Sequence, residues 1–188
     1  MNDGSRWAGI SLARHGETND NVEPIRAQGF TDTPLNETGR RQAHELAERV
    51  AGDGFVSLWA SDLSRARETA EIVGERIGLT PRLDARLREG ARGRWERRLF
   101  IDIERDEPDL YAAWRRAGPE FQFPGGESLL EQQERVAAAL DDVEATGELP
   151  ALVVCHGGSI RVVLCLRDPR GLDAFQEWKI PNVAVVPL

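Results

Sequence analysis

Apolar and polar residues follow one another in blocks that predict strands and helices in turn. Apolar runs predict buried strands at residues 9–13 and 55–61, and a further strand at 150–155. Between them, apolar residues recur at spacings of three and four, which predicts one helix over about 37–51 and another that begins after Asp62 as its N-cap. Strands alternating with helices predict an α/β fold: three layers (αβα), with a mostly parallel sheet and helices on both faces.

The same pattern continues toward the end of the chain. The stretch TPRLDARLRE at 80–89 predicts a short third strand, and a long helix is expected from Ser128 onward. After the 150–155 strand, HGG opens a helix that extends through about Leu166, and AVVPL predicts a strand at the edge of the sheet. Because parallel strands place their carboxyl ends at one edge, a ligand site is expected there.

Residues 91–126 do not fit this regular alternation. They are rich in Arg, Trp, Asp and Pro, and only one helix, around 108–116, is predicted within them. No repeat or linker divides the chain, so we predict a single domain over 1–188 with 91–126 as a substrate-cap insert.

Composition narrows the classes of function. The formal net charge of −8 argues against a nucleic-acid-binding face, and no apolar run reaches the length of a membrane span. The N-terminus lacks a secretory signal pattern, which predicts a cytoplasmic protein. Two cysteines and three histidines, without zinc-site spacing, predict no disulfide and no metal. Arginine is abundant, but its abundance alone does not indicate phosphate binding.

The stretch VVCHGGSIR poses the question of chemistry. Cys155 and Arg161 have the C-x5-R spacing of cysteine-dependent phosphatases, whereas His156 suggests a different nucleophile. Two predicted strands end in a histidine followed by glycine, at His15 in LARHGET and at His156. Both histidines should therefore emerge at the same edge of the sheet. Glycine permits close approach to a ligand, and the N–H groups that open the second loop's helix suit a phosphate.

A series of blocks carries a family resemblance. ARHGET resembles the signature of the histidine phosphatase superfamily, which contains cofactor-dependent phosphoglycerate mutases and acid phosphatases. QGFTDTPLNETGRRQA, SDLSRARETA, REGARGRWE, PGGES and VVCHGGSIR resemble further family segments and occur in family order from residue 10 to 161. The resemblance implies a phosphoglycerate mutase-like fold.

The resemblance also implies roles at the reacting centre. His15 would be the nucleophile that forms a phosphohistidine, and Arg14 and Arg65 would clamp the phosphate oxygens. Glu89 would be the general acid and later the base for water, while His156 would donate a hydrogen bond to the transferring group.

Further contacts to the phosphate are expected from three residues. Asn21 and Gln28 would bind phosphate oxygens, although the loop between them is a residue longer than in many members, and Gly157 would offer its backbone N–H. Glu96 is the rival general acid. Arg97 stands where the family often has glycine, which leaves the shape of the following loop open.

The sequence thus predicts a phosphomonoesterase for small phosphorylated metabolites, without metal or cofactor, and without nucleic-acid or membrane partners; a homodimer is left open. The shortness of the chain favours a phosphatase over a phosphoglycerate mutase. Retention of all five core residues speaks against a non-catalytic phospho-ligand binding protein. The sulfur mechanism lacks an obvious Asp acid loop, so Cys155 is expected to be a buried filler, and His44 a surface residue.

Overall fold

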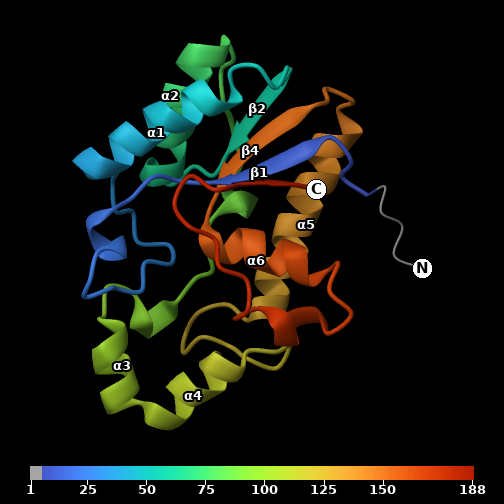
Figure 1. Ribbon diagram of the computed structural model, residues 1–188. Helices are drawn as coiled ribbons and strands as arrows, with labels where there is room; N and C mark the ends of the chain where they lie inside the picture. Colours follow the sequence, from blue (N-terminus) through green and yellow to red (C-terminus); the bar gives the residue numbers. More distant parts are fainter. Residues whose placement is uncertain (1–5) are drawn as a thin grey trace.

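The computed structural model describes residues 6–188, and its strands form one mixed sheet in the order β3-β2-β4-β1-β5 (Figure 1). β1 to β4 are parallel, and β5 pairs antiparallel with β1 as an edge strand. The strands are β1 (Ile10–Arg14), β2 (Ser57–Ala60), β3 (Arg82–Leu83), β4 (Ala151–Cys155) and β5 (Val185–Pro187). The predicted strands are therefore present, with β3 only two residues long.

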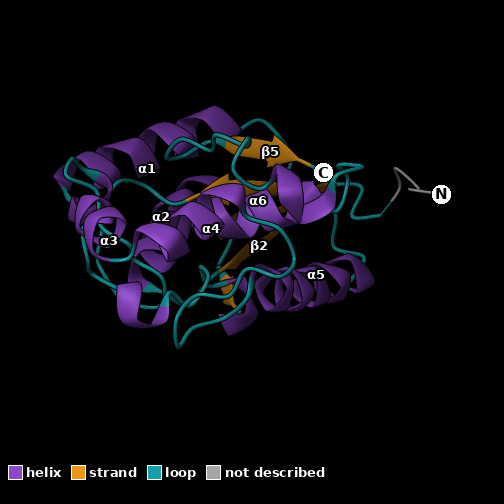
Figure 2. Ribbon diagram, turned by 90° about the horizontal axis from the view of Figure 1, so that it is seen from below, coloured by secondary structure: helices purple, strands orange, loops and turns teal. Residues whose placement is uncertain are grey.

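Two helical layers cover the sheet, and the layering is visible in Figure 2. Helices α1 (Glu37–Val50) and α2 (Ser64–Ile77) pack on one face, and α5 (Leu129–Ala145) and α6 (Gly157–Cys165) on the other. Alternate residues of a strand enter opposite cores: Leu12 joins the α5/α6 core, whereas its neighbour Ala13 joins the α1/α2 core. This arrangement confirms the predicted three-layer αβα fold.

Side-chain caps begin two of the helices, but the predicted cap of α2 is absent. The Asn36 side chain caps α1 by accepting a hydrogen bond from the Gly39 N–H, and Ser128 forms a capping box at the start of α5. The prediction that Asp62 caps α2 is wrong. Its carboxylate instead pairs with the Arg88 guanidinium, with contacts of 2.5 and 2.7 Å, and α2 begins after Leu63.

The insert contains two helices, α3 (Phe100–Asp106) and α4 (Pro108–Arg116), which lie at the lower end of the molecule in Figure 1. α4 was predicted, but α3 was not, because α3 buries only one side chain and offers no apolar periodicity to recognise. An aromatic cluster anchors the insert: the Trp95 ring contacts those of Trp114, Phe121 and Phe123 at centroid distances of 5.8 to 6.3 Å. No helix of the described residues is long and apolar enough to cross a membrane.

Strand register places the two histidine loops together. Arg14 at the end of β1 is paired with Cys155 at the end of β4. The next residue of each strand is a histidine, and the His15 N–H donates to the Cys155 carbonyl at 3.0 Å. Parallel pairing of β1 and β4 is thus what brings His15 and His156, 141 positions apart in the chain, to one edge of the sheet.

Candidate active site

The two imidazole rings lie against each other in the interior. The centroids of His15 and His156 are 5.1 Å apart, and the residues are 3% and 0% exposed. Nδ1 of His15 lies 2.6 Å from the Gly16 carbonyl oxygen. A carbonyl can only accept, so this contact assigns the proton to Nδ1 and leaves the lone pair on Nε2. A ring in this tautomer can act as a nucleophile through Nε2.

The electrostatic surroundings keep both rings neutral. Burial, and then the charges of Arg65 and Arg14, hold the pKa of His15 well below its ordinary value. Burial, Arg65 and His15 itself likewise lower the pKa of His156. The Nε2 atom of His156 contacts the Ser61 hydroxyl at 2.9 Å, while its Nδ1 is buried with no partner among the described residues. When Nε2 accepts from the Ser61 hydroxyl, the neutral ring carries its proton on Nδ1 and can donate it to a bound oxyanion.

The guanidinium groups of Arg65 and Arg14 donate hydrogen bonds to backbone carbonyls, but each keeps a nitrogen without a partner. The Arg65 guanidinium is fully buried and donates to the carbonyls of Thr31 and Gly29, both at 2.9 Å. Arg14 donates to the Ile180 carbonyl at 2.6 Å. The Nε atoms of both arginines are buried without a partner in the described part of the chain. Burial lowers the pKa of Arg65 to about 10, so the side chain stays charged at neutral pH.

Glu89 is held rigidly at the opening of α6. Its carboxylate accepts from the N–H groups of Gly158 and Gly90 at 2.9 and 2.8 Å and from Gln132 Nε2 at 3.0 Å. Burial would raise its pKa, but the charge of Arg92 and these hydrogen bonds bring the pKa down to about 2. Glu89 is therefore ionised in the free protein.

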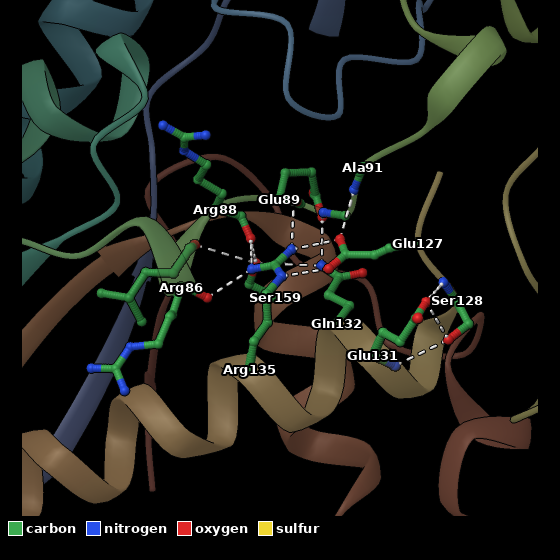
Figure 3. Close-up of polar contacts among 12 residues, drawn as sticks. Arg86, Arg88, Glu89, Ala91, Glu127, Ser128, Glu131, Gln132, Arg135 and Ser159 are labelled. Carbon is green, nitrogen blue, oxygen red and sulfur yellow. Dashed lines mark hydrogen bonds and ion pairs between the residues drawn. The ribbon is translucent and has the colours of Figure 1, made fainter. Parts of the chain in front are cut away.

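Arg135 of α5 supports the backbone that carries Glu89 (Figure 3). Its guanidinium donates to the carbonyl of Glu89 at 2.8 Å and to those of Arg86 and Arg88 at 2.7 Å each, and it pairs with the Glu127 carboxylate at 2.5 Å. One planar side chain thus ties the segment after β3 to α5.

A cavity of about 640 Å³ opens beside these groups. Its wall includes the predicted site residues Arg14, His15, Asn21, Gln28, Glu89 and Gly157. Arg65 and His156 are not part of that wall and lie buried. Thr18 orients the two amide side chains: Gln28 Nε2 donates to the Thr18 hydroxyl, and the Asn21 carbonyl oxygen accepts from the Thr18 N–H at 3.1 Å.

Glu96 and Arg97 have structural roles. The Glu96 carboxylate accepts from the N–H groups of Phe30 at 2.8 Å and Arg92 at 3.2 Å, so it fixes the loop whose carbonyls hold Arg65, and it does not line the cavity. Arg97 has a left-handed backbone with φ of 66°, a conformation that favours glycine. The loop therefore keeps a glycine-type turn despite the arginine.

The thiol of Cys155 is part of the α5/α6 core and is fully buried. Burial raises its pKa to about 12, which disfavours the thiolate that a sulfur nucleophile requires. The C-x5-R spacing therefore arises from a core cysteine followed by a helix. His44 is exposed on α1.

Sequence reasoning gave Asn182 and Arg92 no role, and it considered Arg161 only as part of the C-x5-R spacing, yet all three residues line the cavity. Asn182 donates to the His15 carbonyl at 3.0 Å and lies 3.4 Å from the Asn21 carbonyl oxygen. Arg92 and Arg161 line the same cavity. Asn182 carried no signal, since it stands alone in the stretch before β5, and Arg92 is one of several arginines in its segment.

Known proteins match most of this chain in sequence and in fold. The family model of the histidine phosphatase superfamily (branch 1) matches residues 10–188. A probable phosphoglycerate mutase GpmB of Klebsiella pneumoniae is 40% identical, over 91% of this chain and 79% of that protein. A mycobacterial glucosyl-3-phosphoglycerate phosphatase complexed with VO3 matches with a TM-score of 0.83 and 32% identity, over 94% and 88% of the two chains. A structure of a proposed alpha-ribazole-5'-P phosphatase from Escherichia coli matches with a TM-score of 0.78 and 26% identity, over 90% and 83%.

Proposed function

This chain belongs to the histidine phosphatase superfamily, and on that premise we propose that it is a phosphomonoesterase that hydrolyses small phosphorylated metabolites through a phosphohistidine on His15. The observation that carries the proposal is the meeting of the His15 and His156 rings at 5.1 Å, with the unsatisfied donors of Arg14 and Arg65 beside them. Buried donors without partners are costly unless a ligand completes them.

In the first step, Nε2 of His15 attacks phosphorus in line and the ester P–O bond breaks. Arg14, Arg65 and His156 stabilise the charge on the equatorial oxygens. Glu89 delivers a proton to the leaving oxygen. Its pKa of about 2 belongs to the free protein, and a phosphate dianion bound beside it would raise that pKa and favour proton uptake.

In the second step, water attacks the phosphohistidine, and Glu89 takes the proton that water loses. Phosphate leaves and the neutral imidazole is restored. We propose that none of these steps needs a metal ion, because three fixed cationic and neutral donors already surround the phosphate position. Cytoplasmic location and any homodimer remain predictions.

A release assay with p-nitrophenyl phosphate, in the presence of a chelator, tests the proposal. We expect turnover in the wild type and a loss of roughly ten-thousandfold or more in His15→Ala, since removal of a covalent nucleophile has effects of this size. Cys155→Ser is the matched control and should keep most activity, because the thiol is in the core. A wild type inert from pH 5 to 8 would overturn the proposal, as would activity that survives in His15→Ala and is lost in Cys155→Ser.

Phosphoglycerate mutase is the second candidate, and the name of the Klebsiella relative favours it. A mutase passes the phosphoryl group from His15 to a second substrate instead of water. Incubation with 3-phosphoglycerate and catalytic 2,3-bisphosphoglycerate separates the two reactions. Formation of 2-phosphoglycerate with little free phosphate would establish the mutase, whereas free phosphate as the main product supports the phosphatase.

A further inference from the structure

The peptide unit between His15 and Gly16 is held at both of its polar ends by side chains from distant parts of the chain. The His15 carbonyl accepts a hydrogen bond from Asn182 Nδ2 at 3.0 Å, and the Gly16 N–H donates to Thr69 Oγ1 at 3.1 Å. Because a carbonyl and the N–H that follows it lie in one rigid plane, contacts at both ends fix how that plane is turned. Its rotation is therefore set by α2 and by the segment before β5.

Thr69 serves this peptide unit as an acceptor and is itself held in place. The residue is fully buried on α2, and its hydroxyl donates its single hydrogen to the Arg65 carbonyl at 2.7 Å. The hydroxyl oxygen consequently turns a lone pair toward the Gly16 N–H. One hydroxyl thus joins the helical turn that carries Arg65 to the backbone of the nucleophile.

Asn182 reaches the same peptide unit from the segment that leads into β5, the edge strand beside β1 (Figure 1). Its amide presents the NH2 group to the His15 carbonyl, since a carbonyl only accepts. The adjacent Val183 has a left-handed backbone with φ of 53°, which is unfavourable for a β-branched side chain, and its N–H donates to the Arg14 carbonyl at 3.1 Å. Contacts with the end of β1 therefore hold Asn182 in one place.

The imidazole of His15 takes its orientation from the residue to which this peptide unit leads. Its Nδ1 donates to the Gly16 carbonyl at 2.6 Å. Gly16 lies close against α1, where an added Cβ atom would be 2.4 Å from the Gly39 carbonyl oxygen. A rotation of the peptide unit would displace Gly16, and with it the acceptor that holds the ring and keeps the lone pair on Nε2.

We propose that Asn182 and Thr69 are positioning residues, which fix the peptide unit between His15 and Gly16 and through it the direction in which His15 Nε2 attacks. This inference rests on the proposed phosphatase function. Thr69 is 0% exposed and is not part of the cavity wall. Asn182 does line the cavity, but its NH2 group faces two protein oxygens, the His15 carbonyl at 3.0 Å and Asn21 Oδ1 at 3.4 Å. Both residues therefore act through the protein and not on the substrate.

The test separates attack by His15 from binding of phosphate. Stopped flow measures the first release of nitrophenolate from p-nitrophenyl phosphate, and calorimetry measures the Kd of inorganic phosphate. In Asn182→Ala and in Thr69→Val, we expect the first release to slow roughly tenfold to a hundredfold, the effect of a small displacement of a reacting group. The Kd of phosphate should change by less than about threefold, since the phosphate ligands remain. Thr69→Ser keeps the acceptor and should keep most of the rate, as should Asn19→Ala, at an exposed position outside the cavity wall.

Because both residues act on one peptide unit, their effects should not be independent. The double variant Asn182→Ala/Thr69→Val should lose less than the product of the two single losses. Unchanged first-release rates, fully multiplicative losses, or equal losses in Thr69→Ser and Thr69→Val would each overturn the proposal. A Kd of phosphate that weakens in step with the rate in Asn182→Ala would make Asn182 a phosphate ligand and would overturn it as well.

A spectroscopic signature of the ring does not depend on turnover. The Nδ1 proton of His15 lies in a 2.6 Å contact, so protein with ¹⁵N-labelled histidine should show a downfield proton signal that is absent in His15→Gln. We expect this signal to persist in Thr69→Ser and Asn19→Ala and to broaden or vanish in Asn182→Ala and Thr69→Val. A signal unchanged in both of the latter would overturn the inference. If p-nitrophenyl phosphate is not hydrolysed, the proposed function fails and this signal decides the inference; if Thr69→Val does not fold, Asn182→Ala decides it.

Discussion

At the scale of single residues, the position of the Glu89 carboxylate depends on Gly158, which has no side chain to occupy that space. A Cβ atom added at Gly158 would lie 2.1 Å from the nearer Glu89 carboxylate oxygen, far inside contact distance. The glycine therefore permits the 2.9 Å hydrogen bond from its N–H to that carboxylate. The neighbouring Gly157 is different, since its Cβ would meet Arg14 Nε at an ordinary 3.5 Å.

Gly158→Ala should displace the Glu89 carboxylate and lower kcat. We expect a loss of about a hundredfold or more on an alkyl phosphate, within the usual contribution of general acid catalysis. The loss should be smaller on p-nitrophenyl phosphate, because nitrophenolate leaves without a proton. Steady-state kinetics on both esters measures this, and Gly157→Ala, as the matched variant, should show the smaller decrease. Equal losses on the two esters would contradict a role of Glu89 as proton donor.

At the scale of elements, α5 contributes to the site through Arg135 although it lies outside the cavity wall. The guanidinium holds the carbonyls of Arg86, Arg88 and Glu89 in the segment after β3, and its charge is neutralised by Glu127. A lysine would retain the charge but could not make this planar set of contacts. Arg135 is therefore a positioning residue that acts through the backbone of Glu89.

Arg135→Lys should lower the free energy of unfolding by about 2 kcal/mol, since several buried carbonyls lose donors. It should also lower kcat more than it raises KM, because Glu89 shifts while the phosphate ligands remain. Urea denaturation and steady-state kinetics provide the two measurements. Arg76→Lys is the control, because Arg76 pairs with Glu48 on the surface, and it should change neither quantity appreciably. A stability loss with unchanged kcat would restrict Arg135 to a structural role.

Elements with strong periodicity were predictable from the sequence, and the exceptions have physical reasons. α5 displays its apolar residues at helical spacing, so the long helix from Ser128 onward was correctly expected, and Leu129, Val136 and Leu140 are buried on it. α3 is short and exposed, and its helix depends on packing of the insert. Asp62 has the chemistry of an N-cap, but the ion pair with Arg88, 26 residues away, fixes it elsewhere.

The residues of the candidate site also comprise some that the sequence predicts and some that it does not. His15 and His156 were expected together because the strands that carry them were expected to be parallel, and β1 and β4 do pair in parallel. Asn182 could not be predicted, because it reaches the His15 carbonyl only through the return of the chain toward β5. Arg92 was hidden among neighbouring arginines, and only its burial distinguishes it from Arg94.

At the scale of the whole molecule, the interior contains a site that is unfavourable to the free protein. Two neutral imidazoles and the Arg65 guanidinium are buried together, and donors on Arg14, Arg65 and His156 lack partners in the described chain. The aliphatic cores on both faces of the sheet must offset this cost. An anion that completes these donors would bind only the folded state and so stabilise it.

Acid should therefore destabilise the free protein well above the range in which carboxylates protonate. His15 and His156 have lowered pKa values when folded, so below the unfolded pKa of about 6.5 the unfolded chain binds more protons. Stability is then fully present above about pH 6.5 and falls with decreasing pH, by up to about 1.4 kcal/mol per pH unit for each ring. Glu89 does not contribute in this window, because its contribution is lost only as pH falls from about 4.5 toward a pKa of about 2.

Urea denaturation at pH 7.5 and 5.5, in buffers without phosphate, measures this linkage. We expect the free energy of unfolding to be lower at pH 5.5 by roughly 2 to 3 kcal/mol for the two rings together. His15→Gln should remove about half of that difference, whatever its effect on absolute stability, because it leaves only His156 to titrate. His44→Gln, at an exposed position of α1, should leave the difference unchanged. A wild-type stability that is equal at the two pH values would mean that both imidazoles take up protons in the folded protein as readily as in the unfolded chain, and His15 would then lose at acidic pH the lone pair on which its attack depends.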